Sequence, residues 1–230
     1  AAVSVVPAFG ATTVPEKPVE KPSEDRFGLA VFARRIARIL RETPLKTIGL
    51  TGAYGCGKSS ILNLVDYYLD HPDELEKHLS PDQQKGLVDP KKIIRCRVGA
   101  WGLEEGSVSE HILRQVIQEL SNSVDGLGLV RLPSQYSSAL SDAGSIWCKA
   151  AVAILNAPSD PQKTLERLDN VLACVGKRLV IYLEDLDRNA EDKIFEKEIS
   201  PLFDGLHRMD HLSFVFAAGH HKEATNVLVR

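Results

Sequence analysis

The chain has 230 residues, of which 43% are hydrophobic and 26% are charged, and its formal net charge is −3. This length allows one sizeable α/β core, and the small negative charge argues against a broad nucleic-acid-binding surface. The four cysteines are dispersed, with no C-x-x-C pair and no histidine at metal-ligand spacing, so we interpret them as reduced, buried cytosolic thiols.

The sequence predicts neither a transmembrane segment nor an export signal. The longest apolar stretch, residues 143–157, contains Lys149 and is shorter than the roughly 20 residues needed to span a bilayer. The N-terminus lacks the basic flank and long apolar core of a secretory signal. We therefore expect a cytoplasmic protein in which residues 143–157 form a buried helix.

Residues 1–24 are expected to form a proline-rich arm that is flexible or bound to a partner. The segment contains Pro7, Pro15, Pro18 and Pro22, and its charges alternate between the later prolines, as is typical of extended linkers. The folded domain is then expected over residues 25–230. Because the chain begins with alanine, we expect it to be a piece of a longer polypeptide.

An amphipathic helix is predicted from Gly28 to Arg41, because apolar side chains recur there at helical spacing and arginines occupy other positions. Asp25, just before it, is a candidate N-cap. We interpret Phe27 as a core anchor, with the cover of a nucleotide base as the alternative.

The next motif follows a predicted strand at residues 46–51 and matches the P-loop pattern G-x-x-x-x-G-K-[ST] at every position. Glycines let backbone N–H groups wrap a triphosphate, the lysine supplies charge for the β- and γ-phosphates, and the serine hydroxyl can bind Mg²⁺. A predicted helix over residues 60–69 follows, and a helix N-terminus favours bound anions. The predicted nucleotide-binding residues are Gly52, Ala53, Tyr54, Gly55, Cys56, Gly57, Lys58, Ser59 and Ser60.

Several elements are predicted between this loop and the next motif. Residues 71–90 are polar and interrupted by prolines, which indicates a short helix and a loop. A β-branched run predicts a strand at residues 93–101, whose last residue, Trp101, we interpret as a core anchor. A capping-box pattern at residues 107–110 begins a helix, and another helix is expected at residues 161–174.

A continuous apolar run, residues 178–183, predicts a central parallel strand that ends in the carboxylates Glu184 and Asp185. Ligands of open α/β sheets bind outside the carboxyl ends of the strands, so this Walker B pattern should lie beside the P-loop. We expect Ser59 and one of the two carboxylates to hold Mg²⁺, and the other carboxylate to orient or deprotonate the attacking water. Lys58, Glu184 and Asp185 are therefore the predicted catalytic residues.

A helix through residues 194–203 and a buried strand over residues 211–219 complete the predicted elements. His220 and His221 follow that strand. We interpret them as solvated loop residues, with sensing of the γ-phosphate as the alternative.

Four local patterns make the chain resemble the KAP family of P-loop NTPases, within the wider group of signal-transducing (STAND) and AAA-like ATPases. They are Asp25-Arg26-Phe27-Gly28 before the first helix, the loop from Gly52 to Ser60, the strand end Val98-Gly99-Ala100-Trp101, and Glu184-Asp185-Leu186-Asp187-Arg188. The resemblance spans residue 25 to about residue 219. It implies the family's NTPase fold and suggests an association with membrane-linked signalling and antiviral defence.

The chain differs from the family pattern at two points within the matched region and at a third beyond it. The family's version of the last motif is Asp-Asp-Leu-Asp-Arg, so Glu184 replaces an aspartate, and either Glu184 or Asp185 can be the metal ligand. Many relatives insert membrane helices between the two nucleotide motifs, where this chain offers only the helix interrupted by Lys149. Relatives also continue into a helical lid, which the resemblance implies is missing here.

The sequence thus predicts an α/β fold, a P-loop NTPase three-layer sandwich with a central, mostly parallel sheet. We expect it to bind ATP with Mg²⁺ and to hydrolyse ATP to drive a conformational or assembly switch. GTP is not favoured, because no Asn-Lys-x-Asp motif occurs. The alternatives are a nucleotide-bound scaffold with little turnover and a small-molecule phosphotransferase. Expected partners are further copies of the chain or other domains of a longer chain, with Arg188 as a candidate intersubunit contact.

Overall fold

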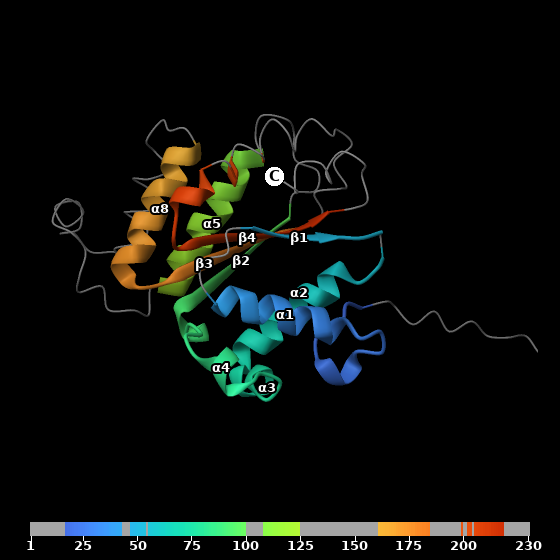
Figure 1. The fold of residues 1–230 in the computed structure, drawn as a ribbon. Helices are drawn as coiled ribbons and strands as arrows, with labels where there is room; N and C mark the ends of the chain where they lie inside the picture. Colours follow the sequence, from blue (N-terminus) through green and yellow to red (C-terminus); the bar gives the residue numbers. More distant parts are fainter. Residues whose placement is uncertain are drawn as a thin grey trace, which may run out of the picture.

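The computed structural model describes residues 17–42, 47–53, 55–99, 108–124, 161–184, 199, 202–203 and 205–218. Within these ranges the chain forms one parallel sheet with helices on both of its faces (Figure 1).

The sheet has four strands, β1 (Thr47–Thr51), β2 (Ile93–Gly99), β3 (Arg178–Glu184) and β4 (Leu212–Ala218). Their order across the sheet is β1-β4-β3-β2, and every neighbouring pair is parallel. The carboxyl ends of all four strands therefore lie at the same edge. β4 separates the strand before the P-loop from the strand that ends at Glu184.

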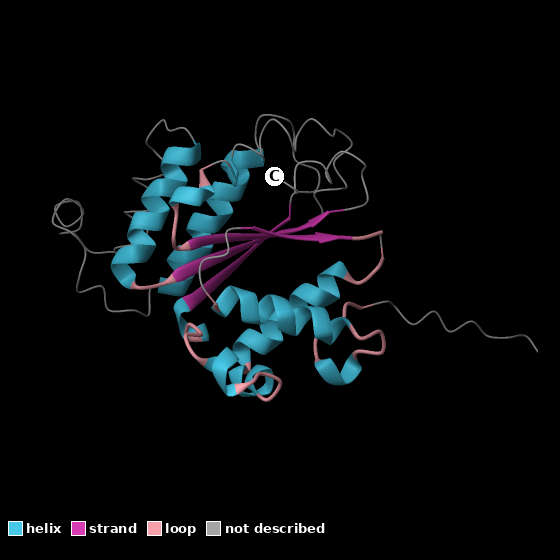
Figure 2. Ribbon diagram, in the orientation of Figure 1, coloured by secondary structure: helices cyan, strands magenta, loops and turns pink. Residues whose placement is uncertain are grey.

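Helices α1 (Leu29–Arg41) and α2 (Lys58–Asp70) cover one face of the sheet, and α5 (Val108–Val124) and α8 (Pro161–Val175) cover the other (Figure 2). Two short helices, α3 (Pro72–Glu76) and α4 (Pro81–Gln84), follow α2. The described residues also include the 3₁₀ turns η1 (Pro22–Glu24), η2 (Pro90–Lys92) and η5 (Leu206–Arg208). The three-layer α/β sandwich that the sequence predicts is confirmed.

Strand β3 shows why both faces need helices. Leu179, Ile181 and Leu183 belong to the hydrophobic cluster with α5 and α8, whereas Val180 and Tyr182 belong to the cluster with α1 and α2. Alternate side chains of a strand point to opposite faces, so a continuous apolar run must be covered on both sides.

The predicted elements within the described ranges are found close to their expected bounds. The strand expected at residues 93–101 is observed as β2, the helix beginning at residues 107–110 as α5, and the polar stretch 71–90 contains α3 and α4. The predicted helix at residues 143–157 lies outside the described residues. Across the described part of the chain, no helix is long and apolar enough to cross a membrane.

Two expectations at the N-terminal side need correction. Phe27 is 83% exposed, so its interpretation as a core anchor is wrong. The predicted arm extends to residue 24, but Val19 packs against the cluster of α1 and α2, and residues 22–24 form η1. Residues 17–24 are therefore part of the folded unit, while residues 1–16 lie outside the described ranges.

Candidate nucleotide-binding site

The loop between β1 and α2 has the backbone conformation that its glycines allow. Gly55 has φ of 76° and Gly57 has φ of 91°, in the left-handed region that other residues rarely adopt. Gly57 is also the N-cap of α2, and a Cβ there would lie 2.8 Å from Leu29 Cδ1 of α1. The loop is therefore shaped by glycine conformation and by close contact with α1. Tyr54 lies outside the described residues.

Lys58 is the first residue of α2, and its side chain lies over the loop that precedes it. Its ammonium Nζ donates to the carbonyl of Gly52 at 2.9 Å and to the carbonyl of Ala53 at 3.2 Å. A positive charge is thus held at the loop beside the N-terminus of a 13-residue helix, whose dipole also favours anions. This arrangement suits a chain of phosphates.

Ser59 and Glu184 meet directly. The hydroxyl of Ser59 donates to Glu184 Oε2 at 3.2 Å, although the two residues are 125 positions apart. Glu184 ends β3, and its side chain is only 19% exposed. The structure thereby brings together two of the three predicted metal ligands, whereas Asp185 lies outside the described residues.

These two side chains fit a Mg²⁺ site that is completed by a nucleotide. Both offer oxygen atoms, the ligands that Mg²⁺ prefers, and Mg²⁺ in phosphate sites takes one or two protein ligands with phosphates and waters. The described residues contain no cluster of three or more His, Cys, Asp or Glu side chains that could hold a metal alone. Ser59 and Glu184 are therefore suited to share an ion with bound phosphates.

Two other predicted loop residues have different surroundings. Ser60 is 7% exposed, and its hydroxyl accepts a hydrogen bond from the backbone N–H of Val19 at 3.0 Å. Its side chain thus joins α2 to the N-terminal segment. Cys56 is an exposed free thiol, so the expectation that the cysteines are buried is wrong at this position. A Cβ on Gly52 would lie 2.5 Å from Cys56 Sγ, so a larger residue at position 52 would require the Cys56 side chain to rotate.

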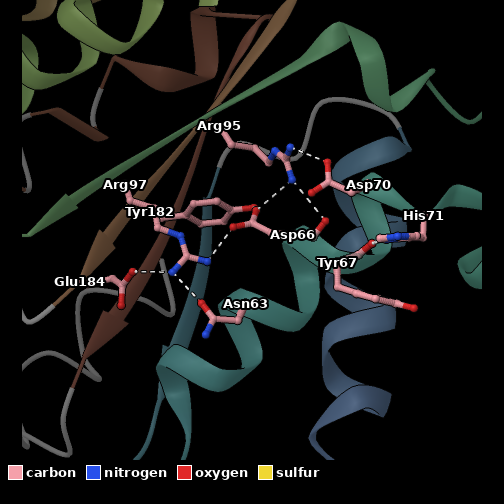
Figure 3. A network of polar contacts seen from close by, with 9 residues as sticks. All are labelled: Asn63, Asp66, Tyr67, Asp70, His71, Arg95, Arg97, Tyr182 and Glu184. Carbon is pink, nitrogen blue, oxygen red and sulfur yellow. Dashed lines mark hydrogen bonds and ion pairs between the residues drawn. The ribbon is translucent and has the colours of Figure 1, made fainter. Parts of the chain in front are cut away.

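A polar network that sequence reasoning missed extends from Glu184 along α2 (Figure 3). Arg97 of β2 donates to Glu184 Oε1 at 3.3 Å, to Asn63 Oδ1 at 2.9 Å and to Asp66 Oδ2 at 2.6 Å. Ser59, Asn63 and Asp66 are spaced by four and then three residues, so they share one face of α2. The P-loop helix and β3 are thus connected through an arginine of the edge strand.

Asp66 is the centre of this network. Its Oδ1 accepts a hydrogen bond from Tyr182 at 3.0 Å and lies 3.4 Å from Arg95 Nη1, while Arg95 Nη2 lies 2.7 Å from Asp70 Oδ1. Burial raises the pKa of Tyr182 well above its usual value, and the charge of Asp66 adds to this effect. Tyr182 therefore stays protonated at neutral pH and remains a donor to Asp66.

The alternation of Arg95 and Arg97 in an otherwise apolar strand was the available signal for this network. Residues two apart in a strand share a face, and so do Asn63, Asp66 and Asp70 on a helix. The sequence does not show that these two faces meet. Arg188, His220, His221 and Trp101 lie outside the described residues, so their predicted roles are not tested.

A model of the KAP family P-loop domain matches residues 29–222. The ORC2 protein of Aeropyrum pernix, solved in ADPNP–ADP complexes, is 12% identical with a TM-score of 0.51, covering 92% of this chain and 45% of that protein. A Walker-type ATPase of Pyrococcus abyssi is 10% identical with a TM-score of 0.42, covering 88% and 47%. The chain thus spans less than half the length of either protein. No curated protein matches it.

Proposed function

We propose, from the premise that this chain belongs to the KAP family of P-loop domains, that it binds ATP with Mg²⁺ and hydrolyses it to drive a conformational or assembly switch. The observation that carries the proposal is the contact of Ser59 with Glu184 at 3.2 Å, because Ser59 is the last residue of the P-loop pattern, whose glycine loop is shaped for phosphate. Binding alone would need the loop and Lys58. A carboxylate placed against the P-loop serine adds the means to hold a metal ion at the phosphates.

Each residue then has a defined task. The N–H groups of the loop and of the first turn of α2 bind phosphate oxygens, and Lys58 supplies charge to the β- and γ-phosphates. Ser59 and Glu184 hold Mg²⁺, which when bound neutralises charge on the phosphate oxygens. Asp185 orients or deprotonates the attacking water. This division assigns the metal to Glu184 because its carboxylate faces Ser59.

The adenine base of the bound nucleotide is proposed to lie against the N-terminal end of α1. Gly57 of the loop approaches Leu29 closely, so the nucleotide's sugar and base would leave the loop near Gly28 and Phe27. Phe27 is 83% exposed in the structure, which suits an aromatic side chain that covers a base. This was the alternative interpretation of Phe27, and its exposure supports it.

The larger context of the domain is also a proposal. We propose that residues 25–230 belong to the NTPase domain, against which Val19 of the preceding segment packs, that this domain acts in the cytoplasm, and that further copies of the chain or further domains complete its site. Membrane-linked signalling or antiviral defence is the context that family resemblance suggests. The alternatives are a nucleotide-bound scaffold with little turnover and a small-molecule phosphotransferase.

Phosphate release from the purified chain separates these functions. We expect ATP-dependent release that is abolished by EDTA, restored by Mg²⁺, and not reproduced with GTP. Tight ATP binding with no release at any protein concentration would favour the scaffold. Release that requires a small-molecule acceptor would favour the phosphotransferase, and no ATP binding at all would contradict the proposal.

A further inference from the structure

Arg97 lies between Glu184 and helix α2 (Figure 3). Its contact with Asp66 is 2.6 Å and that with Asn63 is 2.9 Å, whereas its contact with Glu184 is 3.3 Å. Charge-assisted N–H···O bonds are usually about 2.7–2.9 Å long, so the contact with Glu184 is the weakest of the three. Arg97 is therefore held mainly by α2.

The strand register explains why Arg97 reaches both partners. Arg97 of β2 is aligned with Tyr182 of β3, and Glu184 is two residues further along β3 on the same face. The guanidinium carbon of Arg97 also lies 5.6 Å from the centroid of the Tyr182 ring. These contacts fix the guanidinium beside Glu184 independently of their mutual attraction.

The carboxylate of Glu184 is divided between two neighbours. Its Oε2 accepts from Ser59, and its Oε1 accepts from Arg97. A divalent cation bound by Ser59 and Glu184 would lie near the positive charge of Arg97 and would compete with it for the same negative charge. Binding of the cation therefore has to overcome the attraction between Arg97 and Glu184.

We propose that Arg97 is a positioning residue that acts as the internal counter-ion of Glu184 and thereby sets the divalent-cation affinity of the nucleotide site. This inference rests on the proposed role of Ser59 and Glu184 in metal binding. When the cation binds, the Glu184 carboxylate turns away from Arg97, while Arg97 keeps its hydrogen bonds to Asp66 and Asn63.

The test compares Arg97→Gln with Arg95→Gln in the whole 230-residue chain. Arg95 is on the same face of β2 and is paired with Asp66 and Asp70 of the same helix, and Glu184 is not among the partners found for it. Each variant removes one positive charge and two ion pairs. Arg97→Gln loses the pairs with Asp66 and Glu184, whereas Arg95→Gln loses the pairs with Asp66 and Asp70. Mn²⁺ binding is measured by electron paramagnetic resonance in the presence of a non-hydrolysable ATP analogue.

We expect Arg97→Gln to lower the Mn²⁺ concentration for half-saturation about three- to fivefold, because the competing charge is removed. Arg95→Gln should stay within about twofold of the unmodified chain, and so should Arg97→Lys, which keeps the charge. Loss of structure alone would not tighten metal binding. An unchanged or higher Mn²⁺ requirement in a folded Arg97→Gln protein would overturn the inference.

Asn63→Asp provides a second variant if Arg97→Gln does not fold, as thermal melting without ligand would show. A carboxylate at residue 63 should draw Arg97 further toward α2 and lower the Mn²⁺ requirement, and no decrease would again overturn the counter-ion role. If the unmodified chain binds the ATP analogue but no Mn²⁺, the metal role of Glu184 and this inference both fail. If the metal binds but neither variant changes its affinity, the inference alone fails.

Discussion

Ser59, the second residue of α2, donates a hydrogen bond to Glu184, the last residue of β3, at 3.2 Å across 125 positions of sequence. This contact places the first carboxylate of the Walker B pattern, Glu184, against the P-loop serine. It also makes the site sensitive to the placement of both elements, since a metal ion bound there would hold helix and strand together.

Replacement of Lys58 by alanine is expected to abolish ATP binding with little loss of fold. The Lys58 side chain contacts the loop carbonyls of Gly52 and Ala53 and belongs to neither hydrophobic cluster, so its main contribution is charge for phosphates. Binding of a fluorescent ATP analogue and the thermal midpoint are measured. Lys85→Ala is the control, because the Lys85 side chain is 78% exposed and pairs with Asp82. Near-normal ATP affinity in a folded Lys58→Ala protein would show that Lys58 does not bind the phosphates.

The two carboxylates should respond differently to neutralisation. Asp185→Asn is expected to keep ATP binding and to slow hydrolysis at least about a hundredfold, as for loss of a general base. Glu184→Gln is expected to raise the Mg²⁺ concentration needed for nucleotide binding about tenfold, because an amide oxygen lacks the carboxylate charge. Titrations with Mg²⁺ and single-turnover rates separate the two effects. If the effects of the two substitutions were reversed, Asp185 would be the metal ligand and Glu184 would act on the attacking water.

Gly57→Ala should destabilise the loop more than Gly55→Ala. Both glycines have left-handed φ angles, which cost an alanine about 1–2 kcal/mol, but only at Gly57 would the added Cβ approach Leu29 Cδ1 at 2.8 Å. We expect a loss near 1 kcal/mol for Gly55→Ala and about 1 kcal/mol more for Gly57→Ala. Urea unfolding gives both values. Leu29→Ala in the Gly57→Ala background should recover the added loss, and equal losses for the two glycines would show that the contact has no effect.

Asp25 is expected to stabilise the start of α1 in a pH-dependent way. Its carboxylate accepts from the N–H groups of Ala30 at 2.7 Å and Phe27 at 3.0 Å. Partial burial raises the pKa of Asp25, but these backbone hydrogen bonds outweigh it and lower the pKa overall. A lowered folded-state pKa means that the stabilisation is present above the unfolded pKa of about 4 and is lost as the pH falls through the folded value.

Asp25→Ala should therefore cost about 1 kcal/mol at pH 7, and the difference from the unmodified chain should shrink below about pH 4. Urea unfolding at pH 7 and at a pH below about 4 measures this difference in the free energy of unfolding. Asp82→Ala is the control, since the Asp82 side chain is 90% exposed. A cost that is the same at both pH values would show that the charge of Asp25 is not involved.

The chain is expected to bind ATP but to hydrolyse it slowly as a monomer. Related ATPases complete the γ-phosphate site with an arginine from a neighbouring subunit or a lid, which stabilises charge in the transition state. Arg188 is the proposed intersubunit residue. Sedimentation with ATP and rates over a range of protein concentrations should show activity that rises with self-association. Fast turnover that is independent of concentration in a monomer would show that the site is complete within one chain.

Local features of the fold were predictable because each depends on neighbouring residues. The glycine pattern predicted a loop with left-handed backbone, and Gly55 and Gly57 have it. The apolar run at residues 178–183 predicted a buried central strand, and β3 is one. The interpretation of Phe27 failed because burial of a single aromatic side chain depends on what packs over it, which its neighbours in sequence do not determine.

The sequence by itself determined that a phosphate-binding loop, a carboxylate-ended strand and amphipathic helices are present, since periodicity and turn chemistry are written in consecutive residues. The tertiary structure decided which of these side chains meet. The order β1-β4-β3-β2 and the alignment of Arg97 with Tyr182 bring Arg97, Glu184 and Asp66 together from two strands and a helix. Such contacts depend on strand order and register, which are set by burial over the whole sheet rather than by any local pattern.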